Sequence, residues 1–118
     1  MFVIRKEVMD VFEAHMREQS IQKCMAQVHE VFPEAAARQG EPALRKLVES
    51  GMEKAASYQI LGEREVMLFV DLMMELGANF LEEPKYKWIE ATLKKPDFNE
   101  QQKMDIIYQR LEATSRKG

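Results

Sequence analysis

Two carboxylates, Asp71 and Glu75, are the residues whose types and spacing come closest to catalytic chemistry. They lie four positions apart in an otherwise apolar segment, and residues four apart share one face of a helix. A pair of carboxylates can carry out acid–base chemistry when one of the two is desolvated. The simpler interpretation is that the pair marks the strip of that helix that reaches solvent or pairs with Arg64. We therefore predict no catalytic residues and no enzyme, and keep an enzyme that uses Asp71 or Glu75 as a weaker alternative.

The histidines and the cysteine are not spaced to bind a metal ion together. His15 and His29 are fourteen residues apart, which corresponds to roughly 20 Å along a helix. The single cysteine, Cys24, lies five residues before His29, and so points about 140° away from it around a helix. We expect no metal site and no cofactor, and we expect Cys24 to be a small core residue.

The composition is that of a folded soluble domain. Of the 118 residues, 46% are apolar and 31% are charged, which suits one core with a solvated surface. The net charge of −3 lacks the basic excess that nucleic-acid binding needs. The longest apolar run, residues 66–70, is far shorter than the ~20 residues of a membrane span. Because the chain also lacks a signal-peptide pattern, we expect a single cytoplasmic domain over residues 1–118 that binds neither nucleic acid nor membrane.

Apolar spacing and helix-terminating residues predict an all-α fold. Five Gly and four Pro are few for this length, so long elements are expected. We expect a single bundle of about five helices, with the apolar helix at residues 63–76 in its centre. The other helices are expected at residues 6–31, from Glu41 through Ala55, between Pro84 and Pro96, and from Asn99 to a frayed tail at residues 115–118.

Individual residues mark where these helices begin, end and approach one another. Pro42 is typical of the first turn of a helix, and Gly77 is typical of a C-terminal cap. Asn99 and Gln102 have the spacing of a capping box. Gly51 lies on the apolar face of its helix, so we expect another helix to approach closely there.

The expected first helix carries two apolar stripes that do not line up. A polar patch at residues 17–20 separates them, so the helix either faces different neighbours at its two ends or breaks there. Nine methionines are many for this length, and methionine suits surfaces that adapt to partners. We therefore predict that the first stripe, Met9, Phe12 and Met16, binds a partner protein.

The sequence also resembles a group of small helical accessory proteins encoded in bacterial type VI secretion effector clusters, beside spike, PAAR-tip and effector genes. The resemblance is carried by residues 3–12, 57–60, 63–66 and 69–73, with Gly77, Phe80, Pro84 and Trp88. It extends over roughly residues 3–108 and rests on apolar and charged positions. It implies a helical fold and a secreted effector or its carrier as partner, and it implies no catalytic residue.

Three hypotheses about function follow. The first is a non-enzymatic chaperone or adaptor for a type VI effector or its spike/PAAR carrier. The second is an immunity protein that covers the active site of a toxin acting in the cytosol, since an acidic surface suits a toxin that acts on nucleic acid. The third is the enzyme that uses Asp71 or Glu75. A homodimer formed through the first helix remains a further possibility.

Overall fold

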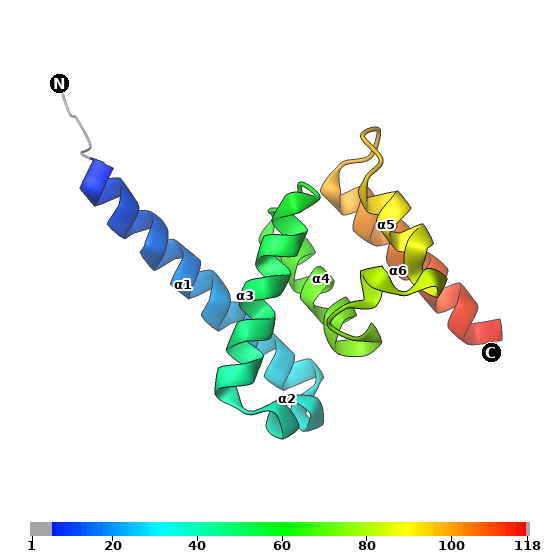
Figure 1. The fold of residues 1–118 in the computed structure, drawn as a ribbon, viewed down its shortest axis with the longest axis horizontal. Helices are drawn as coiled ribbons and strands as arrows, with labels where there is room; N and C mark the ends of the chain where they lie inside the picture. Colours follow the sequence, from blue (N-terminus) through cyan, green and yellow to red (C-terminus); the bar gives the residue numbers. More distant parts are fainter. Residues whose placement is uncertain (1–5, 118) are drawn as a thin grey trace. The chain divides into compact units, whose positions relative to one another are not determined.

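The computed structural model describes residues 6–117, and the side chains of residues 6–11 and 13–114. Within residues 6–117 every regular element is helical, which confirms the predicted all-α class. Figure 1 shows the helices of this range, which are α1 (Lys6–Val31), α2 (Pro33–Gln39), α3 (Glu41–Ser57), α4 (Glu63–Leu76), the 3₁₀ helices η1 (Phe80–Glu82) and η2 (Pro84–Tyr86), α5 (Lys87–Leu93) and α6 (Glu100–Lys117).

The chain divides into two compact units, Met1–Val48 and Glu49–Gly118. Helix α3 contributes its first half to unit 1 and its second half to unit 2. Each unit has its own set of buried apolar side chains. In unit 1 these are Ile21, Cys24, Met25, Val28, Ala36, Leu44 and Val48. In unit 2 the largest are Ile60, Phe69, Leu72, Met73, Phe80, Ile89, Leu93, Met104 and Ile107. The single domain over residues 1–118 stays a prediction.

In unit 1, α1 has the predicted bounds and runs without a break through residues 17–20. Helix α1 ends before Pro33, and Pro33 opens a further helix, α2, that was not predicted. Proline is favoured in the first helical turn, and the three alanines that follow are the best helix formers. Gly40 ends α2 with a positive φ of 81°, so the expected number of about five helices was one too few for the described residues.

In unit 2, α3 and α4 approach closely at Gly51, as predicted. A Cβ atom at this position would lie 2.9 Å from both Val70 Cγ2 and Met73 Sδ, so only glycine is accommodated without movement. Gly77 caps the end of α4 with a φ of 112°, and its main-chain N–H donates to the Met73 carbonyl oxygen at 3.0 Å. The predicted C-terminal cap at Gly77 is confirmed.

The capping box at the start of α6 is also confirmed. The main-chain N–H of Gln102 donates to Asn99 Oδ1 at 2.8 Å, and that of Asn99 donates to Gln102 Oε1 at 2.9 Å. Helix α6 then continues to Lys117. Three of the four residues of the expected frayed tail are therefore helical, while their side chains and residue 118 lie outside the described part.

The predicted fourth helix is correct in place but differs in its first turn. Residues 84–86 form the 3₁₀ helix η2, and the α-helix α5 begins only at Lys87. The main-chain N–H of Tyr86 donates to the Glu83 carbonyl oxygen at 3.0 Å, which is the tighter spacing of a 3₁₀ turn. The 3₁₀ helix η1 was not predicted.

Candidate protein-binding surface

The first half of α1 is amphipathic along its own axis. At 100° per residue, the backbone positions of its apolar residues fall within an arc of about 160°. These residues are Val8, Met9, Val11, Phe12 and Met16. The charged residues of the same turns fall outside that arc, and they are Lys6, Glu7, Asp10, Glu13 and Arg17. A face of this width is typical of a helix that packs against another surface.

This apolar face is exposed in the structure. Val8 is 58% exposed, Met9 37%, Val11 70% and Met16 46%. We call these four residues, Val8, Met9, Val11 and Met16, the α1 stripe. Phe12 belongs to α1, but its side chain lies outside the described part of the structure. The α1 stripe is thus a group of exposed apolar side chains on one face of α1, a face that also carries the exposed His15 about 40° from Val11. Exposed apolar patches on soluble proteins mark interaction sites.

The second half of α1 buries the opposite side of the helix. Ile21, Cys24 and Val28 are at most 2% exposed, and Met25 is 6% exposed. The middle of this buried face and the middle of the α1 stripe are about 180° apart around the helix axis. Because α1 is continuous, the elements that cover its second half lie on the wrong side to cover the α1 stripe. The stripe is therefore exposed because it points to the side of α1 opposite to the buried face.

The last half of α1 is also anchored within unit 1 by polar contacts. Arg45 of α3 donates to both carboxylate oxygens of Glu18, with Nη1 2.7 Å from Oε2 and Nη2 2.5 Å from Oε1. These bonds, with a further one from Gln22, lower the pKa of Glu18 to about 2. His29 Nε2 lies 2.6 Å from Glu41 Oε1. Glu18 therefore marks the start of the anchored part, and the α1 stripe precedes it.

Sequence reasoning selected Met9, Phe12 and Met16 but omitted the two most exposed members of the α1 stripe, Val8 and Val11. Both valines lie within the same arc of the helix. Their angular position on the helix would have identified them. The sequence prediction missed them because it selected residues by methionine content.

The structure places Asp71 and Glu75 near Tyr108 of α6. The Tyr108 hydroxyl donates to the Leu68 carbonyl oxygen at 2.6 Å. Burial raises the pKa of Tyr108, and the negative charges of Asp71 and Glu75 raise it further. Asp71 is half-buried and Glu75 is exposed. The two carboxylates thus help to keep Tyr108 protonated, so the hydroxyl stays a donor.

Arg64 does not pair with Asp71 or Glu75, which corrects one part of the simpler interpretation. Its guanidinium lies 2.6 Å from Glu65 and 3.3 Å from Asp105 of α6. Arg64 is the second residue of α4, and Asp71 lies seven residues, or about 10 Å, further along the helix axis.

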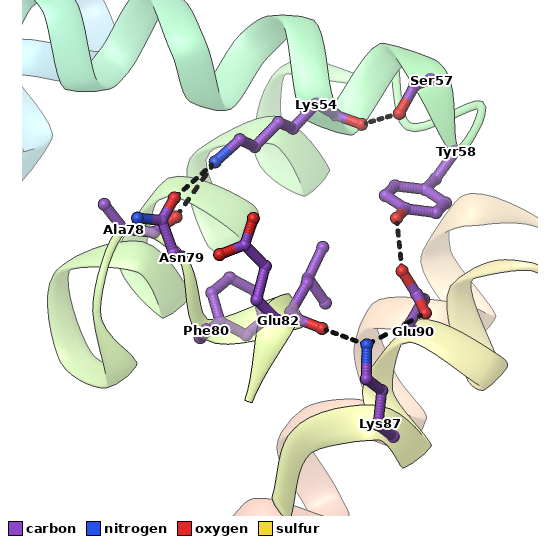
Figure 2. Close-up of a pocket in the computed structure, with 10 residues that line it drawn as sticks. Lys54, Ser57, Tyr58, Ala78, Asn79, Phe80, Glu82, Lys87 and Glu90 are labelled. Atoms are coloured by element: carbon purple, nitrogen blue, oxygen red, sulfur yellow. Dashed lines mark hydrogen bonds and ion pairs between the residues drawn. The ribbon is translucent and has the colours of Figure 1, made fainter. Parts of the chain in front are cut away.

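A half-open cavity of about 240 Å³ lies between the end of α3, η1 and α5, and Figure 2 shows its lining. Lys54 donates to the Ala78 carbonyl oxygen at 3.1 Å, and Lys87 donates to the Leu81 carbonyl oxygen at 3.2 Å. Tyr58 donates to Glu90 at 3.2 Å; burial raises the pKa of Tyr58, and Glu90 raises it further. The two lysines bind carbonyl oxygens of the connection between α4 and α5, and Tyr58 binds α5. The polar side chains that line the cavity therefore stabilise the fold.

The remaining residues with reactive side chains lie apart from one another. Cys24 is buried, as predicted. His15 lies 3.2 Å from Gln19, and His29 contacts Glu41. Among the residues that the structure describes, no three His, Cys, Asp or Glu side chains come together as metal ligands do.

Comparison of this chain with known protein families, with curated proteins and with solved structures finds no match. No helix in the described range has both the length and the apolar character needed to cross a membrane.

Proposed function

We propose that this protein is a non-enzymatic accessory factor that binds another protein through the first half of α1. The observation that carries the proposal is the α1 stripe, whose Val8, Val11 and Met16 are 58%, 70% and 46% exposed. Leaving these side chains in water costs each of them much of the ~1.5–3 kcal/mol that full burial contributes. A partner that covers the stripe recovers that free energy.

The alternation of faces along α1 supports a role for the stripe in binding. A helix that served only the core of this chain would keep its apolar side chains on one face. Instead the apolar face switches to the opposite side at residues 17–20, where Glu18 is held by Arg45. One half of the helix is used within the chain, and the other half is available to a partner.

The sequence resemblance supplies the context of the proposal. We propose that the partner is a type VI secretion effector or its spike/PAAR carrier, and that this protein acts as its chaperone or adaptor in the cytoplasm. We also keep the finer fold prediction, a single bundle with α4 at its centre, as part of the proposal. Four side chains of α4 support it, because Phe69, Val70, Leu72 and Met73 are buried.

The test is co-expression with the effector and the carrier encoded beside this chain. We expect a stoichiometric complex and a higher soluble yield of the effector. The double variant Val11→Asp/Met16→Asp should abolish the complex, because it places two charges in the contact. Ala14→Asp is the matched control, since Ala14 is exposed in the same turns of α1 but lies about 140° from the middle of the stripe. Failure of both neighbours to bind, or equal loss with Ala14→Asp, contradicts the proposal.

Protection of cells from the toxin distinguishes an immunity protein from a chaperone or adaptor. A loading factor changes effector solubility and export, and it leaves cells sensitive to the bare toxin domain. An immunity protein rescues cells that express that domain. The double variant Asp71→Asn/Glu75→Gln should retain effector binding, and loss of function in this folded variant would support the enzyme alternative.

A further inference from the structure

We infer that the surface that receives the α1 stripe is an apolar groove with a basic rim on another protein. This inference rests on the proposed function and specifies the chemistry of the partner. It is carried by two features of the first half of α1, the width of the stripe and the sign of the charges at its edges.

The width of the stripe requires a groove. Its side chains run from Val8 to Met16, about 12 Å of helix axis, and spread over an arc of about 160°. One facing helix covers only the narrower seam of a coiled coil. Contact over nearly half of the circumference requires walls on both sides of the helix, which is the helix-in-groove mode of recognition.

The edges of the stripe are acidic. Glu18 and Glu7 lie about 20° and 40° beyond Val11 on one side, and Glu13 lies about 40° beyond Met9 on the other. Glu18 is already paired with Arg45, which leaves Glu7 and Glu13, both exposed, for the partner. The basic residues Lys6 and Arg17 lie farther back, about 60° and 80° beyond Met9. Rim charges on the partner are therefore expected to be basic, because opposite charges at a rim accelerate association and exclude wrong partners.

The same charges disfavour a second copy of this chain as the occupant. Two copies that joined their stripes would bring acidic edge against acidic edge in a parallel or an antiparallel arrangement. Like charges placed opposite one another oppose association. The stripe lies on the convex surface of a helix, and two convex surfaces touch only along a narrow line. Two copies would therefore leave part of each stripe exposed to water.

The experiment uses the full chain with a photo-crosslinking amino acid at position 11 in the organism that produces it. A crosslinker at position 10, an exposed site about 100° from position 11 and about 180° from the middle of the stripe, is the control. The protein crosslinked only from position 11 is identified and purified, and its affinity for the uncrosslinked chain is measured at low and high salt. The double variant Glu7→Lys/Glu13→Lys is compared with Glu30→Lys, an exposed site of α1 outside the stripe.

We expect affinity to fall as salt rises, and to fall about tenfold in Glu7→Lys/Glu13→Lys but not in Glu30→Lys. Reversing basic residues at the crosslinked site of the partner should restore binding to the double variant. A partner whose affinity responds to neither salt nor charge reversal overturns the basic rim and leaves the proposed function standing. Crosslinking to a second copy overturns the inference. Absence of any protein specific to position 11 overturns both the inference and the proposed function.

Discussion

Arg45 of α3 binds the carboxylate of Glu18 of α1 through two hydrogen bonds, of 2.7 and 2.5 Å, across 27 residues of sequence. This pair lies where α1 changes from an exposed apolar face to a buried one. A bidentate guanidinium–carboxylate contact fixes orientation as well as distance. It therefore fixes the part of α1 that follows the α1 stripe to the first half of α3.

The first prediction concerns the pH dependence of this pair. The bonds from Arg45 lower the pKa of Glu18 from 4.5 to about 2. A folded-state pKa below the unfolded-state pKa means that the pair stabilises the fold above about pH 4.5, and that this contribution is lost as pH falls toward 2. Carboxyl-carbon NMR titration should give a midpoint near 2 for Glu18, and a midpoint shifted up toward 4.5 in Arg45→Met, where the bond from Gln22 remains. An ordinary midpoint in the unaltered protein would show that the pair does not form in solution.

The second prediction compares one substitution on the two faces of α1. Val28→Ala removes two buried methyl groups from a fully buried residue, and should lower the free energy of unfolding by about 2 kcal/mol. Val11→Ala acts on a side chain that is 70% exposed, and should change it by less than about 0.5 kcal/mol. Urea unfolding followed by circular dichroism measures both. A large loss in Val11→Ala would mean that the stripe is covered within the chain.

The third prediction tests the close approach at Gly51. Gly51→Ala places a Cβ 2.9 Å from Val70 Cγ2 and from Met73 Sδ. Overpacking should exceed the gain from the better helix propensity of alanine, for a net loss of about 1 kcal/mol. Val70→Ala removes one of the clashing atoms, so the loss in Gly51→Ala should shrink when Val70→Ala is already present. Strictly additive losses in this double-mutant cycle would argue against the close approach.

The fourth prediction concerns Gln59, which ends α3 with a φ of +66°. The main-chain N–H of Ile60 donates to the Ala55 carbonyl oxygen and that of Gln59 to Ala56, the pattern of a Schellman motif. Glycine suits this left-handed conformation better than a residue with a Cβ. Gln59→Gly should therefore raise the free energy of unfolding by about 0.5–1 kcal/mol, whereas Gln59→Ala should leave it nearly unchanged. Equal effects of the two substitutions would point to the loss of the glutamine side chain instead.

The fifth prediction concerns Tyr108, whose hydroxyl donates to the Leu68 carbonyl oxygen at 2.6 Å. Tyr108→Phe should lower the free energy of unfolding near neutral pH by about 1 kcal/mol. Burial and the nearby Asp71 and Glu75 raise the pKa of Tyr108. Since the unfolded chain releases this proton near pH 10, stability should fall as the pH rises above 10, and less steeply in Tyr108→Phe. Ultraviolet titration of tyrosine, with unfolding measured at pH 8 and 11, checks both effects.

Local signals were sufficient for most of the helices. The reciprocal bonds of Asn99 and Gln102, the cap at Gly77 and the bounds of α1 all follow from residues within a few positions of one another. Helix ends are satisfied by nearby side chains and backbone groups, so their signals are readable in sequence. Pro33 shows the limit of this reading. The same residue ends one helix and opens the next, and only the alanines after it distinguish the two outcomes.

The candidate surface needed the tertiary structure. Averaged over the whole of α1, its two opposed apolar faces cancel, so periodicity shows that the stripes differ but does not show which one the chain covers. That choice depends on contacts between residues far apart in sequence, such as Glu18 with Arg45. The sequence by itself determined the helical class, most helix ends and the two apolar stripes, because these depend on neighbouring residues. Only the tertiary structure decided that residues 21–28 are buried and that the α1 stripe stays exposed, because burial depends on which distant segments reach each side of the helix.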